Sequence, residues 1–81
     1  MTLEPGVTES FREALELDDD VDVTTLTYRG HPSWTSLGHM TLVAALEDRF
    51  DVMLESEDIL DMSSYHKVVE IMGKYVDADQ P

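Results

Sequence analysis

The sequence contains no cysteine, so the chain can form neither a disulfide bond nor a thiolate metal site. It has no apolar run long enough for a transmembrane helix, and no basic region followed by an apolar run that would mark a secretory signal. We therefore expect no membrane insertion and a place in the reducing cytoplasm. A length of 81 residues predicts a single domain, spanning 1–81, with a small hydrophobic core.

Basic residues are also scarce. The chain has five Lys and Arg and eighteen Asp and Glu, which give a formal net charge of −13. Such a surface repels nucleic-acid phosphates and anionic membranes, so we expect no nucleic-acid partner. It attracts proteins that carry basic patches and speeds their encounter. The simpler interpretation is that the acids only keep a small protein soluble.

The spacing of apolar residues predicts an all-α protein. A first helix is expected over residues 1–17, where apolar residues recur every four positions. The acids that begin at Asp18 oppose the helix macrodipole and end it, and residues 18–35 are interpreted as a long, partly extended loop. The remaining helices are expected at Ser36–Phe50, in a short turn at Glu57–Leu60, and after a cap at Ser63 or Ser64.

An acidic stretch with the spacing of a calcium loop fails two tests of that motif. Asp18, Asp20 and Asp22 follow the EF-hand pattern. Val23 and Arg29, however, stand where the motif requires glycine and glutamate. We therefore expect a solvated acidic loop and no built metal site, with weak and loose binding of divalent cations as the alternative.

The histidines suggest neither a zinc site nor an active site. His31, His39 and His66 lack the His-x-x-x-His spacing of zinc ligands and are interpreted as surface residues. Ser36 and His39 are three residues apart, as a nucleophile and its base can be, but no Gly-x-Ser-x-Gly elbow is present. A chain this short also has little room for a substrate pocket, so we expect no enzymatic activity.

Ser36, at the start of the second expected helix, has two interpretations. A helix N-terminus presents free N–H groups and the positive end of the macrodipole. A serine there can cap the helix, or it can hold a phosphate. Ser33 is the nearest competitor but belongs to the preceding turn. Gly38 is either a tolerated weakness of the helix or leaves room for something to approach the backbone beside Ser36.

Several features occur together along nearly the whole chain. They are a Ser36-Leu37 pair at a helix start, a helix ending in Ala45–Phe50, an acidic Glu57-Asp58 turn, and a closing helix around Val68, Val69 and Met72. This combination resembles the acyl carrier proteins, in which a serine of an Asp-Ser-Leu motif opens the second helix and carries 4′-phosphopantetheine through a phosphodiester. Here Thr35 stands where that family usually has aspartate.

The resemblance implies an acyl-carrier-like bundle of three main helices and one short helix, with a long loop between the first two. It implies 4′-phosphopantetheine on Ser36, holding an acyl intermediate as a thioester for enzymes of fatty-acid, polyketide or related biosynthesis. The expected partners are a phosphopantetheinyl transferase and acyl-loading and acyl-processing enzymes with basic patches, with the carrier itself a monomer. An aminoacyl or peptidyl carrier, or an acidic helical interaction module without a prosthetic group, is the alternative.

The resemblance also assigns two sets of residues. The docking face for partner enzymes matches Leu37, Met40, Glu47, Asp48, Asp51 and Glu57. The acyl-chain shelter between the helices matches Leu42, Leu46, Phe50, Val68 and Met72. The family often has further acids in the first turns of the second helix, where this chain has Gly38 and Thr41.

Overall fold

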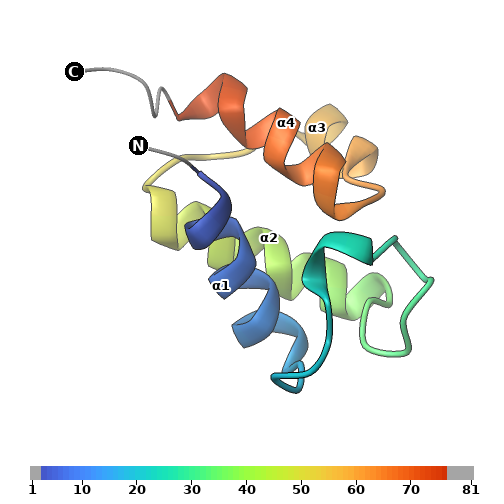
Figure 1. Ribbon diagram of the computed structural model, residues 1–81. Coiled ribbons are helices and arrows are strands. Elements are labelled where there is room, and N and C mark those ends of the chain that lie inside the picture. Colours follow the sequence, from blue (N-terminus) through green and yellow to red (C-terminus); the bar gives the residue numbers. More distant parts are fainter. Residues whose placement is uncertain (1–2, 77–81) are drawn as a thin grey trace.

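The computed structural model of the protein describes residues 3–76, and this part of the chain is helical without any strand. Its elements are α1 (Glu4–Leu15), the short 3-10 helix η1 (Val23–Thr25), α2 (Ser36–Phe50), α3 (Ser56–Asp61) and α4 (Tyr65–Tyr75). In Figure 1, α1 packs along α2, and α3 and α4 lie above this pair. The predicted all-α bundle of three main helices and one short helix is confirmed.

The first helix is shorter than predicted. Residues 1–2 of the predicted range lie outside the described part, and α1 ends at Leu15 rather than at residue 17. The reason is the backbone of Glu16, which adopts the left-handed conformation (φ 52°) and donates its N–H to the carbonyl of Arg12. A left-handed residue directly after the last turn is a common way to end a helix.

The long loop between α1 and α2 is tied to the rest of the protein near its start and in its middle. The Arg12 guanidinium donates hydrogen bonds to the carbonyls of Asp18 (2.9 Å) and Val21 (3.1 Å). Farther along, Thr27 forms an isolated antiparallel bridge with Ser64, at the start of α4. These contacts give the predicted loop a defined path across the helices without making it a strand.

The core contains side chains from α1, α2, α4 and the long loop. Its largest member is Trp34, which lies in the loop just before α2 and is fully buried. The Trp34 ring packs edge-on against Phe11 of α1, with 5.0 Å between the ring centroids. Most other buried residues come from the three longer helices: Val7, Leu15, Leu42, Val43, Leu46, Tyr65, Val68, Ile71 and Met72.

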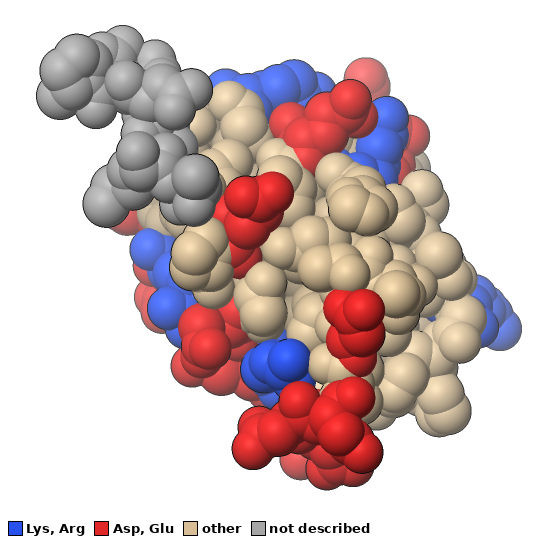
Figure 2. All heavy atoms as spheres, in the orientation of Figure 1, with Lys and Arg blue, Asp and Glu red and all other residues tan. Residues whose placement is uncertain are grey.

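Most acidic side chains have no basic partner within the described residues. The ion pairs there are Arg49–Glu13 (2.9 Å), Lys67–Glu70 (3.1 Å) and Lys74–Asp58 (2.8 Å). Figure 2 shows a dense group of acids at the lower end of the molecule, over the turn that follows α1, where Asp18, Asp19 and Asp20 are exposed. Negative charge is therefore concentrated there as well as spread along the helices.

Two absences hold for residues 3–76. No helix among them is both long enough and apolar enough to cross a membrane. No group of three or more His, Asp or Glu side chains in this range is arranged to hold a metal ion.

Candidate functional site

The N-terminus of α2 is capped by Thr35 and not by Ser36. The Thr35 backbone is extended, and its Oγ1 accepts a hydrogen bond of 3.2 Å from the Gly38 N–H. The Thr35 carbonyl accepts the His39 N–H at 2.7 Å and so begins the helical ladder. The interpretation of Ser36 as the helix cap is therefore wrong, because the preceding threonine makes the capping bond.

Ser36 is the first residue of α2 and its side chain is exposed. Its Oγ lies 3.0 Å from the hydroxyl of Tyr28, which comes from the long loop. As the first residue of a helix, Ser36 lies where free N–H groups and the positive end of the macrodipole stabilise a negative charge. Ser33 lies in the preceding turn, as predicted, and its N–H donates to Nδ1 of His31 (3.0 Å).

His39 is buried, with 9% of its surface exposed, which contradicts its prediction as a surface residue. Its Nδ1 accepts a hydrogen bond from the Trp34 indole (2.9 Å), and its Nε2 lies 2.8 Å from the Ile59 carbonyl. An indole N–H can only donate, so Nδ1 is the acceptor and Nε2 carries the proton. Both ring nitrogens are thus occupied away from Ser36, and His39 is not placed to act as its base. Of the other two, His66 is exposed and His31 is half-buried.

The space beside the backbone of Gly38 is occupied by the backbone of Ser33 and the side chain of Leu15. A Cβ atom at this position would overlap the carbonyl oxygen of Ser33 and approach the Leu15 side chain to 3.0 Å. The space left by Gly38 is therefore filled by the chain itself, at the point where the long loop turns into α2. This contact holds the turn that presents Thr35 and Ser36.

Replacing Gly38 by alanine is expected to lower the free energy of unfolding by about 1–3 kcal/mol, because the methyl group meets a backbone oxygen that cannot rotate away. The matched control is Gly73→Ala in α4, where a Cβ would lie 3.8 Å from Leu3 in ordinary contact. That change should raise stability by roughly 0.5–1 kcal/mol through helix propensity. Urea unfolding measures both, and equal stabilisation by the two alanines would contradict the contact at Gly38.

The residues of the expected docking face differ in their exposure and in their distance from Ser36. Leu37 and Met40 are exposed beside Ser36, at 79% and 54%. Asp48, Asp51 and Glu57 are also exposed. Glu47 is half-buried, and its Oε2 accepts the Leu54 N–H at 2.9 Å. Since an α-helix rises about 1.5 Å per residue, Asp48 is about 18 Å along α2 from Ser36.

The residues of the expected acyl-chain shelter lie in the packed core. Leu42, Leu46, Val68 and Met72 have no exposed surface, and Phe50 is half-buried. A cavity of about 110 Å³ is found closer to α3, and different residues line it: Tyr28, His39, Ile59, Leu60, Met62 and Ser63. Tyr28 thus lines this cavity and also forms the hydrogen bond with Ser36.

A small polar network ties α3 to α4. Lys74 and Tyr75 donate to the two carboxylate oxygens of Asp58, and Glu55 donates its N–H to the Tyr75 hydroxyl. The bond from Lys74, followed by that from Tyr75, holds the pKa of Asp58 below its ordinary value. Asp58 therefore adds stability at neutral pH that is lost as the pH falls through the ordinary carboxyl range, near 4, and then through its lowered pKa.

Comparison with known proteins finds no family model, no curated protein and no solved structure that matches this chain.

Proposed function

We propose that the protein is a carrier that holds an acyl group as a thioester on 4′-phosphopantetheine attached to Ser36. The observation that carries this proposal is the exposed Ser36 hydroxyl at the first residue of α2, next to a cap that Thr35 already provides. Helix capping was the alternative explanation for a serine at this position, and Thr35 caps the helix instead. An exposed hydroxyl without that task suits a covalent attachment point.

The position also suits the chemistry of the attached group. A phosphodiester on Ser36 would place its negative charge against the N-terminus of α2, where backbone N–H groups and the macrodipole stabilise anions. The prosthetic group would supply the thiol that carries the acyl cargo, in a chain that has no cysteine. The protein's own residues would hold and present the group, and catalysis would be left to partner enzymes.

The surface around Ser36 supports docking of such partners. Leu37 and Met40 offer exposed apolar side chains beside the attachment point. The net charge of −13 attracts enzymes with basic patches, among them a phosphopantetheinyl transferase. We place this carrier in the cytoplasm as a monomer that delivers its cargo to fatty-acid, polyketide or related biosynthetic enzymes.

Intact-mass measurement tests the proposal. Purified protein incubated with coenzyme A and a broad-specificity phosphopantetheinyl transferase is expected to gain the mass of one phosphopantetheine group. The same mixture without transferase is the control and should show no gain. A protein that stays unmodified with several transferases would favour the acidic interaction module, whereas an aminoacyl cargo on protein isolated from its own source would favour a carrier of peptide synthesis.

A further inference from the structure

The hydroxyl of Tyr28 lies 3.0 Å from Ser36 Oγ, although the two residues belong to different elements. Tyr28 comes from the part of the long loop between η1 and the turn before α2. An exposed hydrogen bond between two mobile side chains would be weak and short-lived. The strength of this bond therefore depends on how firmly the protein holds the Tyr28 side chain in place.

The backbone around Tyr28 is tied on both sides. The Tyr28 N–H donates to the carbonyl of Ser63 at 2.8 Å, next to the bridge between Thr27 and Ser64. The following residue, Arg29, has a left-handed backbone (φ 65°) and donates its N–H to the Trp34 carbonyl at 2.9 Å. The loop is thus fixed to the α3–α4 connection on one side and to the start of α2 on the other.

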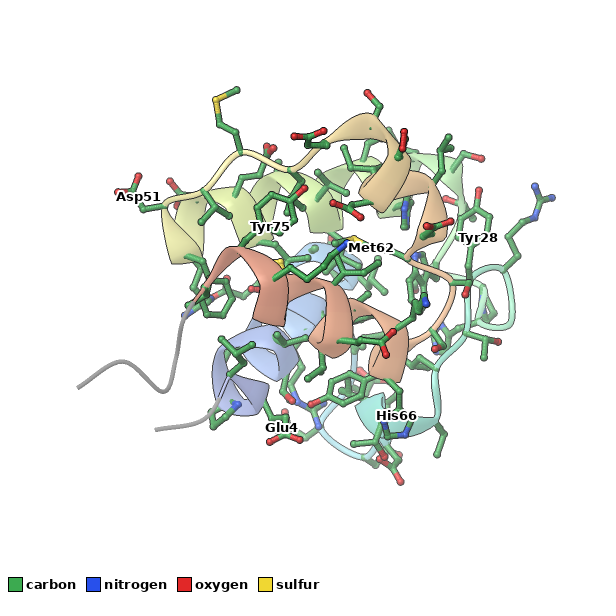
Figure 3. All side chains as sticks on the ribbon, turned by 90° about the horizontal axis from the view of Figure 1, so that it is seen from above. Glu4, Tyr28, Asp51, Met62, His66 and Tyr75 are labelled. Atoms are coloured by element: carbon green, nitrogen blue, oxygen red, sulfur yellow. The ribbon has the colours of Figure 1, made fainter. Side chains whose placement is uncertain are left out.

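The Tyr28 ring is held as firmly as its backbone. It packs edge-on against Trp34, with ring centroids 6.2 Å apart, and against His39, with centroids 5.1 Å apart. His39 cannot turn freely, because both of its ring nitrogens are hydrogen-bonded to other parts of the protein. Figure 3 shows Tyr28 at the end of the molecule where the long loop approaches α3 and the connection to α4. The Tyr28 phenol is thus held by Trp34 and His39, with its hydroxyl within hydrogen-bonding distance of Ser36 Oγ.

We propose that Tyr28 is a positioning residue, whose hydroxyl holds Ser36 Oγ in the orientation required for transfer of phosphopantetheine. This inference rests on the proposed function of Ser36. In the transfer, Ser36 Oγ forms a bond to the phosphorus nearest the pantetheine of coenzyme A. The bond from that phosphorus to the remaining nucleotide breaks and adenosine 3′,5′-bisphosphate leaves, while the serine proton passes to a base of the transferase.

The contribution of Tyr28 is to the geometry of the attacking oxygen. A serine side chain has three staggered rotamers, and the hydrogen bond to Tyr28 selects among them. Holding a nucleophile in its reactive orientation lowers the entropy that must be lost at the transition state. Docking of the transferase depends on other residues, such as Leu37 and Met40, so the effect should appear in kcat rather than in KM.

The test uses Tyr28→Phe, which keeps the ring between Trp34 and His39 and removes only the hydroxyl. Tyr65→Phe is the matched control, since the Tyr65 hydroxyl makes a similar bond of 3.0 Å to Thr8 Oγ1, in a pair that excludes Ser36. The kinetics of phosphopantetheine transfer are measured for both variants and the wild type. We expect Tyr28→Phe to lower kcat by about three- to tenfold with KM nearly unchanged, and Tyr65→Phe to leave both at wild-type values.

The outcomes separate this inference from the proposed function. If the wild type is modified and Tyr28→Phe is modified at the same kcat, the positioning role is overturned while Ser36 remains the attachment point. A change confined to KM, or an equal loss in Tyr65→Phe, also overturns it, because docking or general stability would then explain the effect. A wild type that accepts no group overturns the function and this inference together. Thermal unfolding of both variants verifies that the compared proteins are folded.

Discussion

Replacing Ser36 by alanine is expected to abolish attachment of phosphopantetheine entirely, because Ser36 carries the exposed hydroxyl at the start of α2 that does not cap the helix. Thr35 is committed to the Gly38 N–H, and Ser33 is half-buried in the preceding turn. Intact mass after incubation with coenzyme A and a transferase gives the readout. Ser33→Ala should be modified as the wild type is, and any mass gain in Ser36→Ala would refute the assignment.

The stability of the same variants distinguishes attachment from capping. Ser36→Ala removes an exposed side chain from a helical position, and alanine has the better helix propensity, so its melting temperature should be unchanged or slightly higher. Thr35→Ala loses the bond to the Gly38 N–H and should cost about 1 kcal/mol. If Ser36→Ala were the less stable of the two, Ser36 and not Thr35 would be supporting the helix.

The largest effect on folding is expected from Trp34→Ala. Truncating a buried aromatic side chain typically costs about 3–5 kcal/mol. A domain of 81 residues has a total stability of about 4–12 kcal/mol. Because Trp34 is fully buried and donates to His39, this variant should be largely unfolded or unfold at much lower urea, as followed by circular dichroism.

Two controls accompany the tryptophan variant. Trp34→Phe keeps most of the ring volume but leaves Nδ1 of His39 without a donor, so a smaller loss of about 1–3 kcal/mol is expected. Met53→Ala truncates a side chain that is 85% exposed and should change stability by less than about 0.5 kcal/mol. Similar urea midpoints for Trp34→Ala and Met53→Ala would show that Trp34 does not hold the core together.

The sequence was sufficient to predict the helices because their apolar residues repeat at helical spacing. Leu42 and Leu46, and Val68 and Met72, are each four residues apart, and all are buried in the structure. Residues in a loop do not follow this helical spacing. Trp34 therefore gave no periodic signal, although it is the largest fully buried side chain.

The start of α2 at Ser36 was predicted correctly, but the contacts around Ser36 were not. His39 lies four residues before Val43 and seven before Leu46, so it continues the buried stripe of α2, and that spacing was a signal for its burial. Its partners come from the loop and from α3, and no local pattern specifies such contacts. Whether Thr35 or Ser36 caps the helix depends on which residue is the first with a helical backbone. Two neighbouring hydroxyl residues in a sequence do not reveal this.

The burial of Trp34 gives the protein a built-in optical probe. It is the only tryptophan of the chain, so ultraviolet emission excited at long wavelength arises from a single indole. That indole is hydrogen-bonded to His39, and its ring lies against Tyr28, whose hydroxyl reaches Ser36. Modification of Ser36, if it is the attachment point as proposed, or binding of another protein beside it, is thus expected to change the tryptophan emission of the unlabelled protein.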